Sequence, residues 1–358
     1  MRVNEVKVLM IGSNLKVPGG ITRVVKNYYD AGLNLKVKLE YFPTYLGRGN
    51  IANIAYFTLK YILLFFNLFI LRKSYDVVHI HMSYKGSFVR KKHIIKLLNI
   101  KNIPIILHMH GSQFKDFYNN GTQKRKAEIC NILNRVDVII ALGLQWKEFY
   151  KSISSTKVIS IDNAVFPKKI EAKNEKVYLT SMGVLSERKG TYDLIKVVDK
   201  LRDKIDSKYK FLLAGNGDIE KVKSIIKDLN LEDYFIIPGW INDEQKIEEI
   251  YKKSVLYLLP SYNEGMPMSI LEAMSYGLPI ISTNVGSISS VVEEENGILV
   301  NPGEINEISE AILQLLNNPE KVKKIRKINS SKIDHDYNIY NSVELLSSLY
   351  TKVYRKEL

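Results

Sequence analysis

Short apolar runs alternate with amphipathic helical patterns along this chain of 358 residues, and the alternation occurs in two successive sets. Because strands joined by helical segments pair in parallel, the pattern predicts two parallel sheets covered by helices. The first set of expected strands is Val6–Ile11, Val77–His81, Pro104–His108, Val136–Ala141 and Lys157–Ile161. The second set is Val177–Met182, Lys210–Ala214, Tyr234–Ile237, Val255–Leu259, Pro279–Thr283 and Gly297–Val300.

A polar stretch separates the two sets. Lys168–Lys176 follows the last strand of the first set, and the alternation restarts after it. The chain is long enough for two domains, so we expect domains over residues 1–165 and 166–337, with a final helix over 338–358. The expected fold class is α/β, with two doubly wound, Rossmann-like domains facing across a cleft. In such sheets ligands bind beyond the carboxyl ends of the strands.

The number of cysteines and the pattern of the first residues indicate the compartment in which the protein is expected. A single cysteine, Cys130, excludes an internal disulfide framework and suits a reducing cytoplasm. We expect this residue to be buried in a helix. The first residues read as a strand and lack the pattern of a signal peptide.

Ile51–Leu71 is the most apolar stretch of the chain. It contains Asn53, Lys60 and Asn67, and its unbroken apolar part is short, whereas a membrane span needs about 20 mainly apolar residues. We therefore expect a buried or interfacial helix here rather than a span.

The segment from Glu264 to Met274 is the most informative for function. Pro267 suits the first turn of a helix, where its missing N–H costs nothing, and Gly277 suits the end of that helix. Glu264 is therefore expected in the loop before the helix, and Glu272 about one turn inside it.

The start of this helix is expected to form an anion site through the N–H groups of Gly265, Met266 and Met268. Two carboxylates beside such a site would repel an anion unless they bind neutral groups. Hydroxyls are the obvious choice, so Glu264 is assigned to a sugar and Glu272 to a ribose. The alternative is that Glu272 merely favours helix formation, but it lies in an apolar helix, and a buried carboxylate needs partners.

Two further loops follow expected strands. Gly183–Gly190 contains Arg188 and Lys189, and a cationic loop at the carboxyl end of a strand can bind a diphosphate. Gly19 and Gly20 follow the first strand and would let the backbone approach a ligand closely. Each pattern alone would also fit a solvated turn.

Taken together, these motifs resemble a family 4 glycosyltransferase of the GT-B fold, over nearly the whole chain. They occur in the family's order: Gly19-Gly20, His110-Gly111, Asn163-Ala164-Val165, Arg188-Lys189-Gly190, Gly215-Asn216-Gly217, the Glu264–Glu272 pair with seven residues between, and Gly277-Leu278-Pro279-Ile280-Ile281.

The resemblance implies a role for each matched position. Glu264 would hold hydroxyls of the donor sugar, His110 would lie near that sugar and the leaving phosphate, and Lys189 with Arg188 would bind the diphosphate opposite the backbone of Gly20. The turn Pro238-Gly239-Trp240-Ile241 would lie against the base. The expected catalytic residues are His110, Arg188, Lys189 and Glu264. The expected donor-binding residues are Gly19, Gly20, Gly183, Asn216, Gly239, Trp240, Ile241, Gly265, Met266, Pro267, Met268 and Glu272.

This chain departs from the family pattern at two positions. Val184 stands where the family usually has arginine, so one diphosphate cation is missing, and Arg188 is a candidate replacement. Ala164 stands where the family has glycine after the asparagine.

By resemblance, the expected activity is a retaining, metal-independent hexosyl transfer from a nucleotide-diphosphate sugar, UDP- or GDP-linked, with no cofactor. The acceptor hydroxyl would attack on the face that the leaving group occupies, assisted by the leaving phosphate. The helix over 338–358 would cross back onto the N-terminal domain.

Three other sequence patterns could suggest different kinds of site, but each is incomplete. His79, His81, His108 and His110 alternate on two strands and could in principle converge on zinc, but histidines that close apolar strands more often serve other polar roles. Gly215-Asn216-Gly217 lacks the third glycine of a dinucleotide-binding fingerprint. No aromatic-rich motif accompanies Arg90–Lys92, so nucleic acid is not an expected partner.

Two alternative functions remain open. The chain could be a catalytically silent partner of another transferase, which only Val184 favours, or a nonhydrolysing sugar-nucleotide epimerase.

Charge is distributed unevenly along the chain. Residues 1–165 contain 25 Lys and Arg against 9 Asp and Glu, a net charge of +16, whereas residues 166–358 carry −2. Each Lys or Arg near an anionic bilayer contributes about 1 kcal/mol, and Ile51–Leu71 could add an apolar edge. We expect a cytoplasmic protein, peripheral on the inner membrane face, that glycosylates a lipid-linked, phosphate-bearing glycan of bacterial surface polysaccharide. The alternative is a surface that is merely rich in lysine.

Overall fold

The computed structural model describes residues 6–169 and 176–357. The chain forms two units, Met1–Ala164 with Ile339–Leu358, and Val165–Asn338; they are called unit 1 and unit 2 below. The polar stretch 168–176 lies partly outside the described residues.

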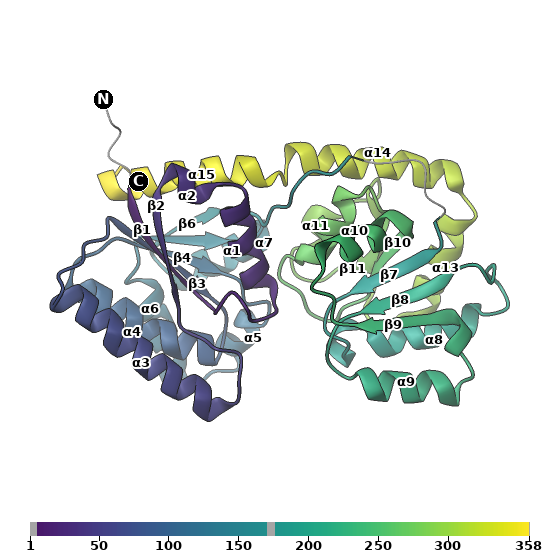
Figure 1. Cartoon of the computed structure of the whole chain (residues 1–358), viewed down its shortest axis with the longest axis horizontal. Helices are drawn as coiled ribbons and strands as arrows, with labels where there is room; N and C mark the ends of the chain where they lie inside the picture. The colour runs from purple at the N-terminus through teal and green to yellow at the C-terminus, as the bar shows by residue number, and fades with distance from the viewer. Residues whose placement is uncertain (1–5, 170–175, 358) are drawn as a thin grey trace. The chain divides into compact units, whose positions relative to one another are not determined.

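Unit 1 is built on a six-stranded parallel sheet in the order β2-β1-β3-β4-β5-β6 (Figure 1). Its elements are β1 (Lys7–Gly12), α1 (Gly20–Asp30), α2 (Leu33–Lys36), β2 (Lys38–Pro43), α3 (Asn50–Phe69), β3 (Val77–Met82), α4 (Gly86–Ile100), β4 (Ile105–Met109), α5 (Phe114–Asn119), α6 (Gln123–Leu133), β5 (Val138–Ala141), α7 (Leu144–Ile153), β6 (Lys157–Ser160) and α15 (Ile339–Arg355).

β2 is the one strand of this sheet that the sequence pattern missed. It is an edge strand that pairs only with β1, and Phe42 is its one buried residue. Because one buried position gives no alternation, no periodic signal marks it. Cys130 lies in the expected helix but is half-buried rather than buried.

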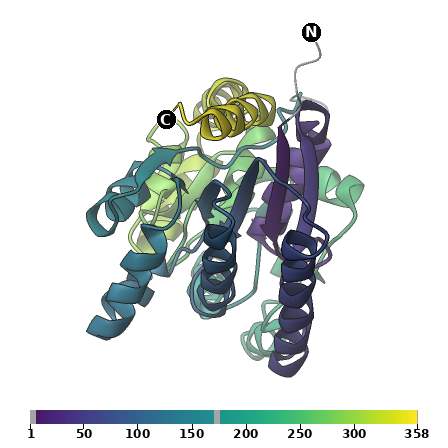
Figure 2. The ribbon, with the colours of Figure 1, turned by 90° about the vertical axis from the view of Figure 1, so that its left-hand side faces the viewer.

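The two faces of the unit 1 sheet differ in character. Alternate residues such as Ile80 and Leu107 join an apolar core with α3, α4 and α6, and the intervening positions point to the opposite face. His79, His81 and His108 occupy intervening positions, and the hydroxyl of Tyr350 from α15 lies 2.7 Å from Nδ1 of His79. Figure 2 shows α15 on one side of this sheet and α3 and α4 on the other.

Only a narrow stripe of α3 side chains packs against the rest of unit 1. Its buried residues are Asn53, Leu64, Asn67 and Leu68. Its exposed side chains, here called the apolar face of α3, include Ile51, Ile54, Leu59, Ile62, Leu63, Phe65 and Phe66. Within the described parts of the chain, only α3 is long and apolar enough to cross a membrane, and 22% of its most apolar window is buried. Of the two positions expected for this helix, the buried one is therefore wrong. The exposed apolar side chains agree with the interfacial one.

Unit 2 repeats the architecture with the strand order β12-β11-β10-β7-β8-β9, all pairs parallel. Its elements are β7 (Tyr178–Met182), the short 3₁₀ helix η1 (Glu187–Lys189), α8 (Thr191–Leu201), β8 (Lys210–Ala214), α9 (Ile219–Asp228), η2 (Glu232–Tyr234), β9 (Phe235–Gly239), α10 (Glu244–Lys253), β10 (Ser254–Leu259), α11 (Met268–Ser275), β11 (Ile280–Thr283), α12 (Ile288–Val291), β12 (Gly297–Val300), α13 (Ile305–Leu316) and α14 (Pro319–His335). In Figure 1, α8 and α9 cover one face of this sheet, and α10 and α11 cover the other.

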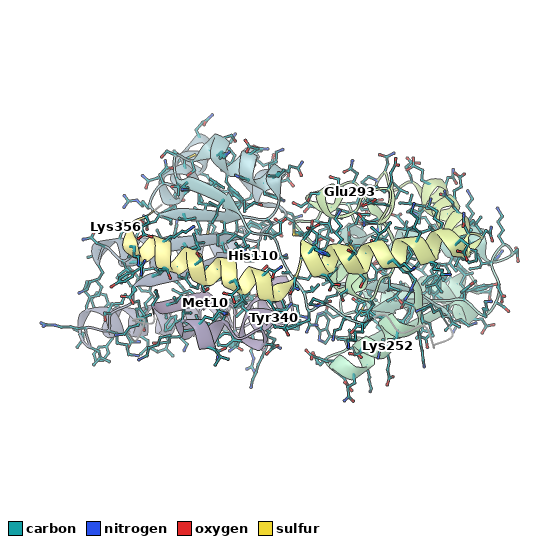
Figure 3. All side chains as sticks on the ribbon, turned by 90° about the horizontal axis from the view of Figure 1, so that it is seen from above. Met10, His110, Lys252, Glu293, Tyr340 and Lys356 are labelled. Carbon is teal, nitrogen blue, oxygen red and sulfur yellow. The ribbon has the colours of Figure 1, made fainter. Side chains whose placement is uncertain are left out.

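The packing of α15 gives a direct test of unit 1. Figure 3 looks onto this helix, on which Leu346 is fully buried and the adjacent Leu345 is 60% exposed. Leu346→Ala should lower the free energy of unfolding by about 2–5 kcal/mol, because it leaves a cavity in the packed face. Leu345→Ala, the matched control, should change it by less than about 0.5 kcal/mol. Urea titration measures both, and equal effects would contradict this packing.

Candidate active site

The strand order of unit 2 contains a topological switch point. β7 lies between β8 and β10, so the chain leaves β7 toward one side and later returns to its other side. Ligands of doubly wound sheets bind beyond the carboxyl ends of the two strands at such a point. Here those ends lead into Gly183–Gly190 after β7 and Pro260–Pro267 after β10. The sequence singled out the first of these segments and, from Glu264 onward, the second.

An ion pair joins these two segments. Nζ of Lys189 contacts Oε1 of Glu264, and the side chains are only 16% and 8% exposed. The sequence assigned the two residues to different parts of a ligand and did not predict that they pair. A poorly hydrated carboxylate needs such a partner, because leaving it alone costs several kcal/mol.

Arg188, next to Lys189, forms hydrogen bonds with the backbone of the loop after β10. Its Nη1 donates to the backbone oxygen of Asn263 at 2.7 Å, and its own backbone oxygen accepts from the N–H of Tyr262 at 2.9 Å. Arg188 therefore ties the β7 loop to the β10 loop. Val184, whose position usually holds arginine in the resembling family, is 43% exposed and supplies no charge.

Gly286 supports the Glu264 loop and was missed in the sequence. Its φ is +58°, and a Cβ there would lie 1.9 Å from the backbone oxygen of Glu264. The neighbouring N–H of Ser287 donates to the backbone oxygen of Gly265 at 2.8 Å. The loop that carries Glu264 thus packs directly against Gly286, and any other residue at position 286 would displace that loop.

Tyr257 is a second residue that the sequence did not indicate. It is buried on β10, and its hydroxyl donates to the backbone oxygen of Met182 at 3.1 Å and accepts from the same residue's N–H at 3.2 Å. Burial, followed by the charges of Glu272 and Glu264, raises the pKa of Tyr257 well above its ordinary value. The hydroxyl therefore stays protonated beside both carboxylates.

α11 begins as expected, within one residue. Pro267 is its N-cap and Met268 its first residue, while Glu272 lies one turn further and is half-buried. Met266, Pro267 and Met268 are buried, and Gly265 is half-buried.

The other expected donor-binding residues of unit 2 lie at the ends of β7, β8 and β9. A Cβ on Gly215 would lie 1.6 Å from the backbone oxygen of Gly183, so these strand ends approach too closely for a side chain. Asn216 is exposed and its backbone oxygen accepts from Leu185 N–H at 2.6 Å. Gly239 closes β9, and Trp240 is 42% exposed ahead of Ile241.

Three expected site residues belong to unit 1. Gly19 caps α1 and Gly20 begins it, beyond the end of β1, and a Cβ on either would meet no atom within 4 Å. β1 lies between β2 and β3 and is the switch point of this sheet. His110 follows β4, is half-buried, and its N–H donates to the backbone oxygen of Met82 at 2.8 Å.

The histidines set aside as a metal site do come together. Nitrogen atoms of His79, His81 and His108 all lie within 4.8 Å of one another. Ligand nitrogens around tetrahedral zinc lie about 3.4 Å apart, given bonds of about 2.0–2.1 Å. Nε2 of His79 and Nδ1 of His108 lie 3.3 Å apart and are joined by a hydrogen bond, so one of these two nitrogens carries a proton. The three histidines are close enough to be metal ligands, but these two nitrogens could not both bind a metal without a change of tautomer.

Lys91 is a further buried polar residue that the sequence did not single out. It lies on α4, and its Nζ donates to Oγ1 of Thr44, which donates in turn to the backbone oxygen of Gly12 at 3.0 Å. Burial, and then the charge of Arg90, lowers the pKa of Lys91 from 10.5 to about 7.

Comparison with known proteins agrees with this architecture. Residues 162–332 match the family described as glycosyl transferases group 1. An uncharacterized glycosyltransferase of Haemophilus influenzae is 33% identical over 204 residues, 56% of each chain, so the match spans just over half of that relative. The UDP-Gal:alpha-D-GlcNAc-diphosphoundecaprenol alpha-1,3-galactosyltransferase of Escherichia coli is 26% identical over 321 residues, 78% of this chain and 76% of that one.

Solved structures show the same fold. Sucrose-phosphate synthase from Thermosynechococcus elongatus superposes with a TM-score of 0.80 at 16% identity, covering 98% of this chain and 100% of that one. Anabaena HepE in complex with UDP and glucose gives a TM-score of 0.75 at 15% identity, covering 97% and 100%. At these identities the likeness concerns the fold alone, which is the GT-B arrangement of two Rossmann-like units.

The burial of Lys91 predicts a pH dependence of stability. Its folded pKa lies below the unfolded value, so between pH 7 and 10.5 the unfolded chain binds a proton that the folded chain does not. Its contribution to the free energy of unfolding therefore rises with pH across that window, by up to about 1.4 kcal/mol per pH unit.

Lys91→Met should remove this slope and raise stability at pH 7. Lys96→Met, exposed on the same helix, is the control and should keep the slope. Urea titrations at several pH values measure the difference between variants. A slope unchanged in Lys91→Met would show that its amine is not held neutral.

Proposed function

Since residues 162–332 match the group 1 glycosyl transferases, we propose that this chain moves a sugar from a nucleotide-diphosphate donor to an acceptor hydroxyl, with retention at the anomeric carbon. The observation that carries the proposal is the buried pair of Lys189 and Glu264 at the switch point of unit 2. Such a pair places a cation that can bind a diphosphate directly beside a carboxylate that can bind sugar hydroxyls.

When the donor binds, Lys189 and Glu264 would each exchange their contact with the other for a contact with the donor. A diphosphate brings negative charge to Lys189, so the ammonium turns toward it, and Glu264 becomes available to accept hydrogen bonds from the sugar. Breaking the bond at the anomeric carbon puts negative charge on the leaving diphosphate, which Lys189 and the start of α11 stabilise where it develops. Glu272 on the same helix is assigned to the ribose.

A uridine or guanosine diphosphate sugar is the proposed donor. HepE, which shares the fold, is solved with UDP and glucose bound. Trp240 follows the end of β9 with 42% of its surface exposed, and it is assigned to the base together with Gly239 and Ile241. Asn216, Gly183, Gly19 and Gly20 are assigned to the backbone lining of the donor site.

We assign the acceptor to unit 1 and to a membrane. The Escherichia coli relative is named for a diphosphoundecaprenol acceptor, and residues 1–165 carry a net charge of +16. The apolar face of α3 has no charged residue, since Lys60, the one charge of that helix, lies over the rings of Phe42 and Tyr56. A helix with such a face lies in the headgroup region of a bilayer. The proposed setting is the inner face of the cell membrane and a lipid-linked glycan.

Removing either member of the ion pair tests the activity. Glu264→Ala and Lys189→Ala should each lower sugar transfer at least tenfold, because one charge-assisted hydrogen bond contributes about 1.5–3 kcal/mol. Lys223→Ala, an exposed cation of α9, is the control and should transfer normally. Near-normal transfer by a folded Glu264→Ala variant would end the assignment. Product analysis separates transfer from epimerisation, which needs no acceptor.

Chelation tests metal independence. Transfer should survive excess EDTA, because Lys189 supplies the positive charge beside the diphosphate. The one Asp-x-Asp sequence, Asp334-His335-Asp336, is exposed at the end of α14 rather than at the switch point. Loss of transfer with EDTA, restored by magnesium or manganese, would contradict the proposal.

Liposome sedimentation tests the membrane assignment. Binding should require anionic lipid and fall at about 0.5 M salt, where the Debye length is only a few ångströms. Asp at both Ile62 and Phe66 should abolish it, whereas Leu345→Asp, an exposed apolar residue of α15, should not. A protein that ignores anionic liposomes at low salt would refute the membrane assignment and leave the transferase assignment standing.

A further inference from the structure

β3 and β4 bring two imidazoles into a direct hydrogen bond. His81 lies on β3 beside His108 of β4, and His110 follows β4 on the same face of the sheet. Nδ1 of His81 lies 2.8 Å from Nε2 of His110, with ring centroids 5.0 Å apart. One of these two nitrogens must carry the shared proton, and the other must accept it.

Burial favours the neutral form of both rings. Burial lowers the pKa of His81 well below its ordinary range, and the neighbouring histidines and the ammonium of Lys91 lower it further. Burial also lowers the pKa of His110, to about 3. A neutral imidazole has one N–H and one lone pair, so the direction of the shared bond fixes the state of the other nitrogen on each ring.

The second nitrogen of His81 decides the direction. Nε2 of His81 is buried and has no hydrogen-bond partner among the residues that the structure describes. If His81 accepted from His110, this nitrogen would be a buried N–H without an acceptor, which is rarer in folded proteins than an unfilled acceptor.

From this geometry we infer that His81 donates from Nδ1 to Nε2 of His110, which holds His110 as the tautomer with its proton on Nδ1. His81 is then a positioning residue, and His110 presents an N–H to the ligand. This N–H suits an oxygen of the leaving phosphate or of the donor sugar. It excludes His110 from acting as a general base through Nδ1. The identity of the receiving oxygen rests on the proposed function, whereas the tautomer does not.

Nitrogen NMR of the full-length protein labelled with ¹⁵N-histidine tests the inference directly. His110→Asn removes one of the six histidine signals and so assigns His110. The inference requires a protonated Nδ1 and an unprotonated Nε2 on that ring in the wild type. A proton on Nε2 of His110 overturns it, whatever the activity.

Two changes at His81 test its positioning role. Asparagine places an amide N–H near the position of Nδ1, so His81→Asn should keep the proton of His110 on Nδ1. Aspartate offers only acceptors there, so His81→Asp should move that proton to Nε2. An unchanged tautomer in a folded His81→Asp variant would show that another group sets it.

Sugar transfer provides a second readout. Asparagine at position 110 can donate from the place of Nδ1, whereas glutamine places its amide near Nε2, so His110→Asn should retain about tenfold more transfer than His110→Gln. The reverse order would overturn the donor role of Nδ1. If the tautomer is as inferred but no form of the protein transfers sugar, the proposed function fails and the tautomer assignment stands.

Discussion

The buried contact between Lys189 and Glu264 is the interaction on which the candidate site depends. It exists because β7 and β10 are neighbours at the centre of the unit 2 sheet, so that the loops after them meet. Arg188 and Gly286 hold those loops in place through the backbone of Asn263 and Glu264. A buried ion pair stabilises a fold only weakly, because desolvation offsets most of the attraction. In the proposed function, its value is that both charges are kept ready for a ligand that carries charge and hydroxyls.

In unit 1, the sheet face that α15 covers holds a cluster of polar side chains. The apolar core fills one face, which leaves the intervening positions of β3 and β4 to histidines packed against Tyr350. Burial lowers the pKa of His81, and the inferred donation from His81 to His110 would give the proposed site a donor of fixed direction. The last helix of the chain thus packs on the face that holds a residue of the site, although the two are far apart in sequence.

Much of this architecture follows from local pattern, and the exceptions have physical reasons. Strand–helix alternation predicted eleven of the twelve strands that the structure describes, and among these only β2, an edge strand with one buried residue, gave no signal. The pairing of Lys189 with Glu264 could not be predicted, because it depends on which strands become neighbours across 75 residues. Gly286 and Tyr257 act through contacts remote in sequence and have no local motif. For α3, composition showed that it is apolar, but only packing showed which residues are exposed.

The central claim, that the Lys189–Glu264 pair is a nucleotide-sugar site, is tested most directly by binding without an acceptor. The measurement is a thermal-shift titration of the full-length protein with UDP-, GDP-, ADP- and dTDP-sugars, in parallel with Lys189→Met and the control Lys223→Met. A ligand that binds only the folded state at 100 times its Kd stabilises it by about 2.7 kcal/mol, a shift of several degrees. The account predicts that one class of nucleotide sugar produces this shift in the wild type and the control, and that Lys189→Met loses it. A folded wild type that none of these sugars stabilises, or a shift that Lys189→Met retains in full, would contradict it.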